Sequence, residues 1–444
     1  MFLSVVLVQV LLNREHPQQL TFFARPMTAL QDTGSLSRRL TLLATLYVAQ
    51  GLPTGFFSQA LPAILRQYGV SLSVISLSGM LALPWALKFL WAPWVDHHFS
   101  ARVGQRRSWI IPMQLAGILV LLGLSFWSPE RLRSGAYVEL FVLLFLVNLF
   151  AATQDIAADG LAVRLLGIGE RGWGNGIQVA GYRLGLIAGG GVLLAVVGIY
   201  GWHQAFVCLA AVLALMSLPI LFYREPSPRH TNSESRHLWK LWFSFFRRPG
   251  LTGWLVVLAT YKAGESLGSA MVKPMLVDYG YTLAQIGWMV STIGSVSTLV
   301  GALFGGWLTG KVGRFPALLS FSLLQAGALA SYGLLAWWHD SGELTPAWVY
   351  AVNAIEHFVA GMATAAILTA VMDLCRPESA GSDFTLQVSL LTAFGGGFYM
   401  VSGRVAEWLG YTHFYLVSAV MAVIFTWPVW KFCHRQGLLH PASP

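Results

Sequence analysis

Long apolar stretches alternate with short polar segments along almost the whole chain. Each stretch holds about 20 residues or more, and a helix of that length crosses the hydrocarbon layer of a bilayer, which is about 30 Å thick. We therefore expect an all-α, polytopic membrane protein. The pattern predicts twelve membrane-spanning helices, at residues 38–66, 72–95, 108–128, 137–166, 172–199, 202–223, 249–279, 283–310, 314–337, 346–373, 382–409 and 411–434.

Composition agrees with this prediction, because 56% of the 444 residues are hydrophobic and only 11% are charged. Soluble domains carry about 25% charged residues. The net charge of +9 does not indicate nucleic-acid binding, since the basic residues of membrane proteins gather in cytoplasmic loops. Cys208, Cys375 and Cys433 lie far apart, so we expect no disulfide framework, no metal site and no cofactor.

The lysines and arginines of the predicted loops gather on one side of the membrane. Loops on that side hold 18 of them, whereas the opposite loops hold only Arg66, Arg131 and Arg133. The positive-inside rule therefore places the basic side and both termini in the cytoplasm. Residues 1–36 open with an apolar run that is too short to span a bilayer and does not fit a signal peptide, and Met27 is a candidate for the true start.

The two halves of the chain repeat each other. YGVSLSVI at 68–75 recurs as YGYTLAQI at 279–286, with Ser71 and Thr282 as expected helix N-caps. Three further pairs are separated by 209 residues: Gly104 and Gly313, Gln178 and Gln387, Gly201 and Gly410. Parallel repeats of this kind build transporters from two six-helix bundles. The expected divisions are an extension (1–36), an N-terminal bundle (37–223), a cytoplasmic linker (224–248), a C-terminal bundle (249–435) and a tail (436–444).

The loop after predicted helix 2 reads APWVDHHFSARVGQRRSW, and the loop after predicted helix 8 reads GGWLTGKVGR. Both resemble the signature loop of the major facilitator superfamily. The resemblance implies a cytoplasmic gate that holds the halves together and releases them during transport. The residues assigned to this gate are Asp96, Gly104, Arg106, Arg107, Lys311, Gly313 and Arg314. In the second loop Gly310 replaces the acid, and for Arg106 and Arg107 the alternative is positive-inside anchoring alone.

Further segments resemble the AmpG-related permeases, a group that includes muropeptide importers, acetyl-CoA transporters and the RhtX/FptX siderophore importers. The segments are KFLWAPWVD (88–96), ATQDIAADGLAVRLL (152–166), GYRLGLIAGGG (181–191), LATYKAGES (258–266) and EHFVAGMATAAILTAVMDLC (356–375). Enterobacterial members carry two more helices after the twelfth. Their absence here, the form of helix 4 and the CRPESAGSDFTLQ loop favour the siderophore branch.

Ionisable residues occur deep within several predicted spans, where they are costly and usually functional. Asp155 and Asp159 are four residues apart and share one helix face. Arg183 lies about 16 Å into helix 5, close to the midplane. A fixed positive charge there is suited to an anionic substrate group. The candidate substrate-binding and coupling residues are Asp155, Asp159, Arg183, Lys262, Glu265, Glu356, His357, Lys88, Gln50 and Tyr261.

Several of these residues have structural alternatives. Lys262 and Glu265, three apart on one helix, would form a purely structural pair. The two crowded aspartates would share a proton, or one of them would pair with Arg164 in a cytoplasmic gate. His357 would be a satisfied interior imidazole, and Asp373 would serve the loop after helix 10.

The expected function is import by alternating access through a cavity between the halves. GIGERG at 167–172 follows a helix, and GGWLTGKV at 305–312 lacks the final Ser or Thr of a P-loop, so no nucleotide site is credible. We therefore predict a non-enzymatic monomer of the bacterial inner membrane, driven by an ion gradient, with the proton as the simplest ion. The predicted cargo is a siderophore, ferric or free. A muropeptide permease is the alternative, and a drug or metabolite exporter is a third.

Overall fold

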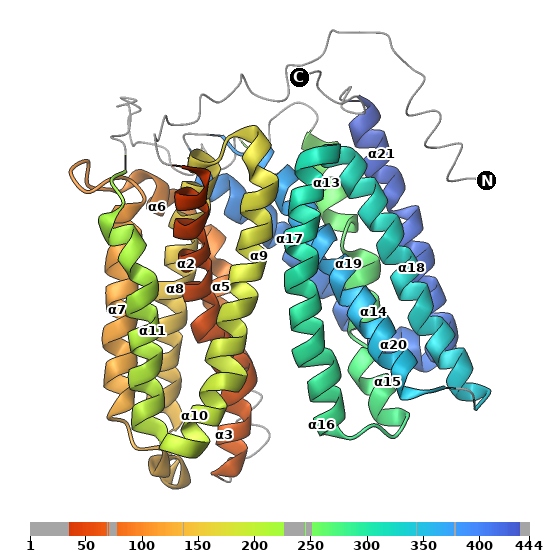
Figure 1. Cartoon of the computed structure of the whole chain (residues 1–444), viewed down its shortest axis with the longest axis horizontal. Coiled ribbons are helices and arrows are strands. Elements are labelled where there is room, and N and C mark those ends of the chain that lie inside the picture. The colour runs from red at the N-terminus through yellow and green to blue at the C-terminus, as the bar shows by residue number, and fades with distance from the viewer. Residues whose placement is uncertain are drawn as a thin grey trace.

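The structure, a computed structural model, describes residues 35–68, 70, 78–135, 137–225, 245, 251–342, 344–376 and 379–435. Within these ranges every regular element is a helix (Figure 1). Met27, Ser71, the tail 436–444 and most of the linker 224–248 lie outside the described residues.

The first half of the chain supplies predicted helices 1 to 6. In chain order they are α2 (Leu36–Gly55), a π-helical turn (Phe56–Ala60) and α3 (Leu61–Gln67); α5 (Leu83–Leu87) and α6 (Ala92–His97); α7 (Arg107–Ser125); α8 (Tyr137–Leu165); α9 (Arg171–Ile187) and α10 (Leu193–Tyr200); and α11 (Trp202–Phe222). Helices α2 and α9 pack closely. Gly189 lies in the π-helical turn after α9, and a Cβ added to it would lie only 1.9 Å from the carbonyl oxygen of Leu52 in α2.

The second half supplies predicted helices 7 to 12. In chain order they are α13 (Leu251–Thr260), α14 (Ala263–Ser269) and α15 (Val272–Asp278); α16 (Leu283–Ile286) and α17 (Gly294–Val312); α18 (Arg314–Asp340); α19 (Pro346–Asp373); α20 (Ala380–Ile424); and α21 (Thr426–Arg435). The predicted cap at Thr282 is confirmed, since its hydroxyl accepts the backbone N–H of Gln285 at 3.3 Å.

Nine helices of the described residues are long and apolar enough to cross a membrane, and they account for ten of the twelve predicted crossings. The last of these spans, Ala380–Arg435, contains two crossings, because Gly410 inside α20 has φ 70° and ψ 161° and separates two helices, the second of which continues into α21. The other two crossings, at 72–95 and 249–279, were expected as continuous helices, and this expectation needs correction. The described part of the first consists of short helical pieces, and the second is divided into α13, α14 and α15.

The breaks in these two crossings coincide with basic residues. Lys88 begins a 3₁₀ turn after α5, and Lys262 separates α13 from α14 with φ −96° and ψ 4°. Non-helical backbone at membrane depth is tolerated only where it is buried in protein or lines a water-filled cavity. The breaks therefore mark the interior of each half as the place where the chain departs from regular structure.

The glycines of the sequence repeat occupy equivalent turns in the two halves. Gly104 and Gly313 have φ of 111° and 92°, and Gly201 and Gly410 have φ of 86° and 70°. Residues with a side chain rarely adopt this left-handed region of the backbone, whereas glycine does so without steric cost. The 209-residue spacing thus corresponds to turns of the same kind after helices 2 and 8 and after helices 5 and 11.

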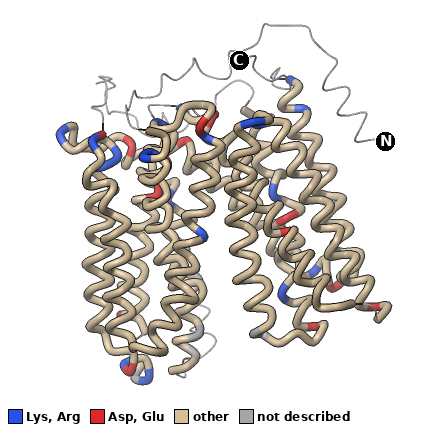
Figure 2. Tube along the Cα trace, viewed as in Figure 1, with Lys and Arg blue, Asp and Glu red and all other residues tan. Residues whose placement is uncertain are grey.

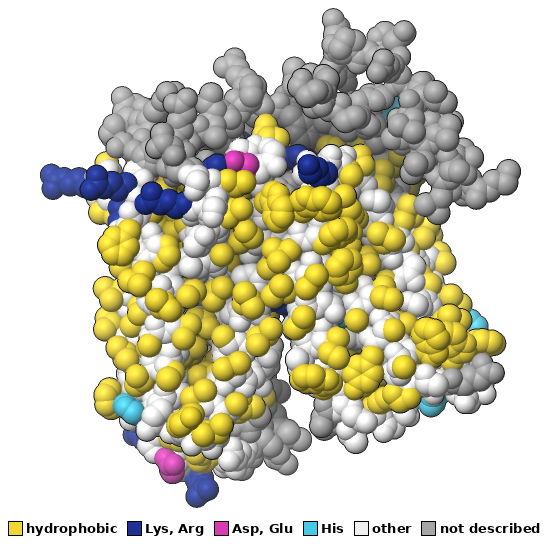
Figure 3. Space-filling view, in the orientation of Figure 1, with side chains coloured by type: hydrophobic (Ala, Val, Ile, Leu, Met, Phe, Trp, Pro, Cys, Tyr) yellow, Lys and Arg dark blue, Asp and Glu magenta, His cyan; other side chains and the backbone are white. Residues whose placement is uncertain are grey.

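The two halves meet at one end of the molecule, which we call the basic end because lysines and arginines of the loops gather there (Figure 2). Arg106 directly precedes α7, and Arg171 and Arg314 begin α9 and α18 at this end. One hydrophobic cluster at this end combines residues of both halves, such as Ile156 and Ala366. Two other clusters each belong to a single half. The halves therefore share a core at the basic end and separate toward the opposite, far end, where Figure 3 shows the surface hollowed between them.

Candidate functional site

Asp96, at the end of α6, joins the two halves at the basic end. Its carboxylate is paired with the guanidinium of Arg106 in its own half. It also accepts the backbone N–H of Ser382 at 2.7 Å and the Ser382 hydroxyl at 2.5 Å, both from α20 in the other half. The side chains of Asp96 and Arg106 are fully buried. Arg106 fits there because Gly160 and Gly381 leave room for its guanidinium.

The other residues assigned to the gate from the first loop have partners within the first half. Arg107 donates to the carbonyl oxygens of Ile220 at 3.2 Å and Leu221 at 2.9 Å. Glu225, which follows α11, accepts the backbone N–H groups of Arg106 and Arg107 at 2.8 and 3.1 Å. A Cβ at Gly104 would collide with the Glu225 side chain. These contacts fasten the end of α11 to the start of α7.

Arg314, from the second loop, belongs to an ion network that also connects the halves. The Asp373 carboxylate accepts Arg171 of the first half at 2.7 Å and Arg314 of its own half at 2.7 Å. Arg314 also donates to the carbonyl oxygen of Ile168. Gly313 precedes α18, and Lys311 is exposed.

The prediction of a loop role for Asp373 therefore needs correction, since this residue bridges two arginines from different halves. Sequence reasoning missed Arg171 and Ser382 as well. The sequence did contain a signal for Arg171, because it begins helix 5 at the basic end and carries the charge opposite to that of Asp373, which ends helix 10 at the same end. Ser382 carried no signal, because a serine at the start of an apolar span is unremarkable in sequence.

Glycines bring α9 and α17 into backbone contact between the halves. A Cβ on Gly172 would lie 2.3 Å from the carbonyl oxygen of Gly306, and a Cβ on Gly306 would lie 2.3 Å from that of Gly172. A Cβ on Gly176 would lie 2.8 Å from the carbonyl oxygen of Ala302. Any side chain at these positions would force the halves apart.

A buried polar network lies inside the first half, below the gate. The Lys88 ammonium pairs with Asp155, and both side chains are 7% exposed. Asp159, one turn along α8, accepts the hydroxyl of Tyr47 at 3.2 Å and the amide of Gln178 at 3.0 Å. The two aspartates share one face as predicted, but only Asp155 has a cation as its partner within the described residues.

The proposed alternative, in which one of these aspartates pairs with Arg164, is not what the structure shows. Arg164 donates to Gln105 at 2.5 Å and lies 3.6 Å from Glu225. At 1.5 Å per residue, Asp155 lies about 15 Å along α8 from Leu165 at the basic end, close to the middle of a bilayer.

A second network lies inside the second half. Lys262 donates to Glu265 at 2.5 Å and to the Thr364 hydroxyl at 2.8 Å. Glu356 accepts the amide of Gln325 at 2.9 Å and lies 2.9 Å from Nδ1 of His357. The pairing of Lys262 with Glu265 has the geometry of the structural alternative raised from the sequence.

The remaining candidates at this depth have few partners. Tyr261 donates to the carbonyl oxygen of Ala363 at 3.4 Å. Gln50 is 2% exposed, and its amide nitrogen has no hydrogen-bond partner in the described part of the chain. Arg183 is half-buried and makes no hydrogen bond or ion pair with any described residue.

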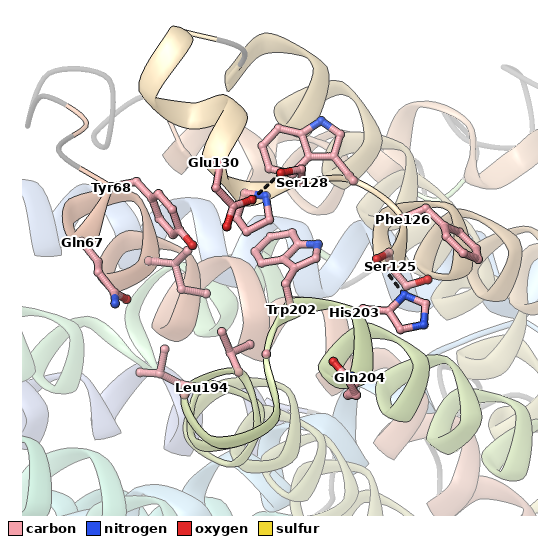
Figure 4. A pocket seen from close by; sticks show the side chains of 16 residues that line it. Gln67, Tyr68, Ser125, Phe126, Ser128, Glu130, Leu194, Trp202, His203 and Gln204 are labelled. Atoms are coloured by element: carbon pink, nitrogen blue, oxygen red, sulfur yellow. Dashed lines mark hydrogen bonds between the residues drawn. The ribbon is translucent and has the colours of Figure 1, made fainter.

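A separate cavity of about 530 Å³ lies at the far end of the first half (Figure 4). Its lining includes Tyr68, Glu130, Trp202 and His203, and it contains none of the candidate residues. A hydrogen bond from the Ser128 hydroxyl lowers the pKa of the exposed Glu130 carboxyl, so this group is ionised at neutral pH. The cavity borders one half only and is not the space between the bundles.

The sequence model of the Major Facilitator Superfamily matches residues 43–398. The chain belongs to this superfamily. A solved structure of a major facilitator transporter, FucP in the outward conformation, has 13% sequence identity and a TM-score of 0.64, and the match covers 90% of this chain and 98% of that one. At this identity the likeness concerns the fold alone.

Known relatives narrow the family further. The anhydromuropeptide permease of Escherichia coli (strain K12) is 30% identical over 398 residues, which is 87% of this chain and 78% of that protein. A putative transporter AmpG 4 of Rickettsia felis is 26% identical over 397 residues, which is 87% of this chain and 94% of that protein. The chain is therefore an AmpG-related permease, a multi-pass secondary transporter of the major facilitator superfamily.

Proposed function

We propose that this permease imports an anhydromuropeptide across the bacterial inner membrane, using the proton gradient. The observation that carries the proposal is the 30% identity to the Escherichia coli anhydromuropeptide permease along 87% of the chain. Alternating access between two bundles provides the route, and the buried charges inside the two bundles provide the means of recognising cargo and protons.

The muropeptide replaces the siderophore as the favoured cargo. The siderophore prediction depended on the absence of two further helices, on the form of helix 4 and on the loop after helix 10. Of the two relatives named above, one carries the name anhydromuropeptide permease and the other the name putative transporter AmpG 4. The identity to these relatives extends over almost 400 residues, whereas two of the three features behind the siderophore prediction are short segments, so the alternative raised from the sequence is the better supported cargo.

The proposed orientation follows from the loop charges. The basic end faces the cytoplasm by the positive-inside rule, and the termini lie on that side. The contacts of Asp96 with Ser382 and of Asp373 with Arg171 then close the cytoplasmic side. The hollow between the halves opens to the periplasm (Figure 3). This is the state in which an importer receives its cargo.

The proposed proton carrier is the aspartate pair of α8. Two carboxylates that share one lysine are one positive charge short of neutrality, and a proton supplies it. Lys88 pairs with Asp155, whereas Asp159 accepts the neutral donors Tyr47 and Gln178, so Asp159 is the better position for an exchangeable proton. Lys262 and Glu265 form the corresponding pair of the second half.

The proposal is tested with the purified full-length protein in proteoliposomes that contain a pH indicator. With an acidic exterior, labelled anhydromuropeptide is expected to accumulate, and its addition is expected to acidify the lumen. Ferric and iron-free siderophores are measured in parallel. Siderophore uptake without muropeptide uptake would reinstate the earlier cargo. Uptake that is insensitive to the pH gradient would remove proton coupling.

A further inference from the structure

Arg183 lies on the face of α9 that points toward the second half. On that face Gly172 and Gly176 contact Gly306 and Ala302 of α17. Arg183 follows Gly176 by seven residues, which is two helical turns, so its side chain leaves the helix on the same face but nearer the far end. The cores of the two halves are separate there. The guanidinium therefore faces the gap between the bundles.

Arg183 differs from the other bases at this depth because it has no acid in its own half as a partner. Lys88 and Lys262 are each paired with a carboxylate of the same half. For Arg183 the described residues offer no hydrogen bond or ion pair. The carboxylates that act on it electrostatically, Glu265 and Glu356, belong to the opposite half.

Those two carboxylates are already engaged elsewhere. Glu265 accepts Lys262 at 2.5 Å, and Glu356 accepts Gln325 and lies against His357. Arg183 is about 18 Å from Arg171 along α9, close to the bilayer midplane. An unpaired guanidinium at this depth is costly unless water or an anion solvates it. The guanidinium in the gap therefore has no hydrogen-bonded or ion-paired partner among the residues that the structure describes.

We propose that Arg183 binds a carboxylate group of the cargo and selects cargo that carries one. The planar guanidinium presents two parallel N–H donors that match the two oxygens of a carboxylate, which an ammonium cannot do. The inference rests on the proposed function, because the peptide part of an anhydromuropeptide ends in a carboxylate. It names the chemical group of the cargo that this residue recognises.

The first experiment measures equilibrium binding to the full-length protein in nanodiscs by calorimetry. The ligands are an anhydromuropeptide as its free acid and the same compound with every carboxyl amidated. The wild type is expected to bind the free acid about 10- to 100-fold more tightly than the amide. Arg183→Gln is expected to bind both with the weaker affinity, and Arg183→Lys to recover part of the preference. Arg133→Gln, at an exposed arginine of the far end, is the matched control.

The second experiment does not depend on the identity of the cargo. Phenylglyoxal modifies accessible arginines, and peptide mass spectrometry reports the modified fraction at each position. Arg183 is expected to react faster than the buried, paired Arg106, and N-acetylalanine at millimolar concentration is expected to protect it while N-acetylalanine amide does not.

The outcomes separate the two proposals. If the wild type binds neither muropeptide form but N-acetylalanine still protects Arg183, the proposed cargo is wrong and the carboxylate site stands. If the free acid and the amide bind the wild type equally, the site is refuted. If neither muropeptide form binds and no carboxylate protects Arg183, both proposals fail.

Discussion

Asp96 of the first half accepts the backbone N–H and the hydroxyl of Ser382 in the second half, at 2.7 and 2.5 Å, while the same carboxylate pairs with Arg106. The ion pair belongs to one half and stays together when the halves part. Of the bonds that Asp96 makes, the two to Ser382 must break. Bonds from neutral donors to a charged acceptor contribute about 1.5–3 kcal/mol each, so thermal motion and cargo binding can reverse this closure.

Ser382→Ala is expected to weaken the closed basic end. The change removes the hydroxyl bond and leaves the Asp96–Arg106 pair intact, so the closed population should fall about 10- to 100-fold relative to the open one. Spin labels at Arg102→Cys and Lys311→Cys, two exposed positions at the basic end, measure the distance between the halves. The background carries Cys208→Ser because this cysteine is exposed.

The matched control for that experiment is Ser320→Ala. Ser320 lies in α18, and its hydroxyl donates to the carbonyl oxygen of Pro316 in its own helix. The distance distribution should therefore remain that of the wild type. A Ser382→Ala protein with unchanged distances would show that the hydroxyl bond does not stabilise the closed state.

Gly172→Ala is expected to hold the basic end open. The added methyl group would lie 2.3 Å from the carbonyl oxygen of Gly306, and backbone atoms on both sides leave no flexible neighbour to move aside. The label pair at the basic end should move apart, and uptake should fall at least 10-fold. Gly327→Ala, at a helical glycine with no neighbour within 4 Å, should transport like the wild type. Normal closure in Gly172→Ala would contradict the backbone contact.

Asp373→Asn is expected to destabilise the closed state more than Arg314→Gln does. The aspartate is shared by two arginines, and its loss breaks the ion pair of Arg171, whose side chain is 3% exposed. Arg314 is 16% exposed and is partly hydrated. Breaking a buried pair from one side costs about 3–5 kcal/mol.

A double-mutant cycle of Arg171→Gln with Asp373→Asn, read from the basic-end distance distribution, should give a coupling energy of about 1–3 kcal/mol. Additive effects of the two changes would argue that the bridge between the halves contributes nothing to closure.

Asp155→Asn is expected to destabilise the first bundle, and Lys88→Gln in the same protein is expected to restore most of the loss. The single change takes from the buried Lys88 ammonium the carboxylate that it pairs with, and breaking a buried pair from one side costs about 3–5 kcal/mol, whereas the double change removes both members of the pair. Thermal unfolding in detergent compares the two single variants and the double variant. Additive losses would contradict a paired interaction between these residues.

The coupling carboxylates are tested by amide substitution. Asp155→Asn, Asp159→Asn or Glu265→Gln should abolish uptake driven by a pH gradient while the protein still inserts, because an amide cannot release a proton. Exchange of cargo without a gradient should persist in Asp159→Asn, whose neutral partners Tyr47 and Gln178 remain. Glu139→Gln, 54% exposed at the far end, is the control. Undiminished gradient-driven uptake in Asp155→Asn and Glu265→Gln would remove their coupling role.

Much of the fold followed from local pattern. Apolar stretches of membrane-spanning length gave boundaries within a few residues for helices such as α8 and α19. The 209-residue repeat anticipated Gly104 and Gly313 as equivalent turns, both of which have positive φ. Hydropathy did not reveal the breaks in helices 2 and 7, because a broken helix and a continuous one bury similar apolar surface and differ only in backbone angles.

The sequence by itself determined the helical membrane architecture and the depth of the buried charges, since both depend on spacing along one helix. Only the tertiary structure decided which charges are partners. Asp155 and Asp159 share a face of α8, yet one pairs with Lys88 and the other meets Tyr47 and Gln178, and Asp373 bridges arginines from two halves. Such pairings depend on how helices distant in the chain pack against each other, and periodicity within one helix contains no information about the side chains of its neighbours.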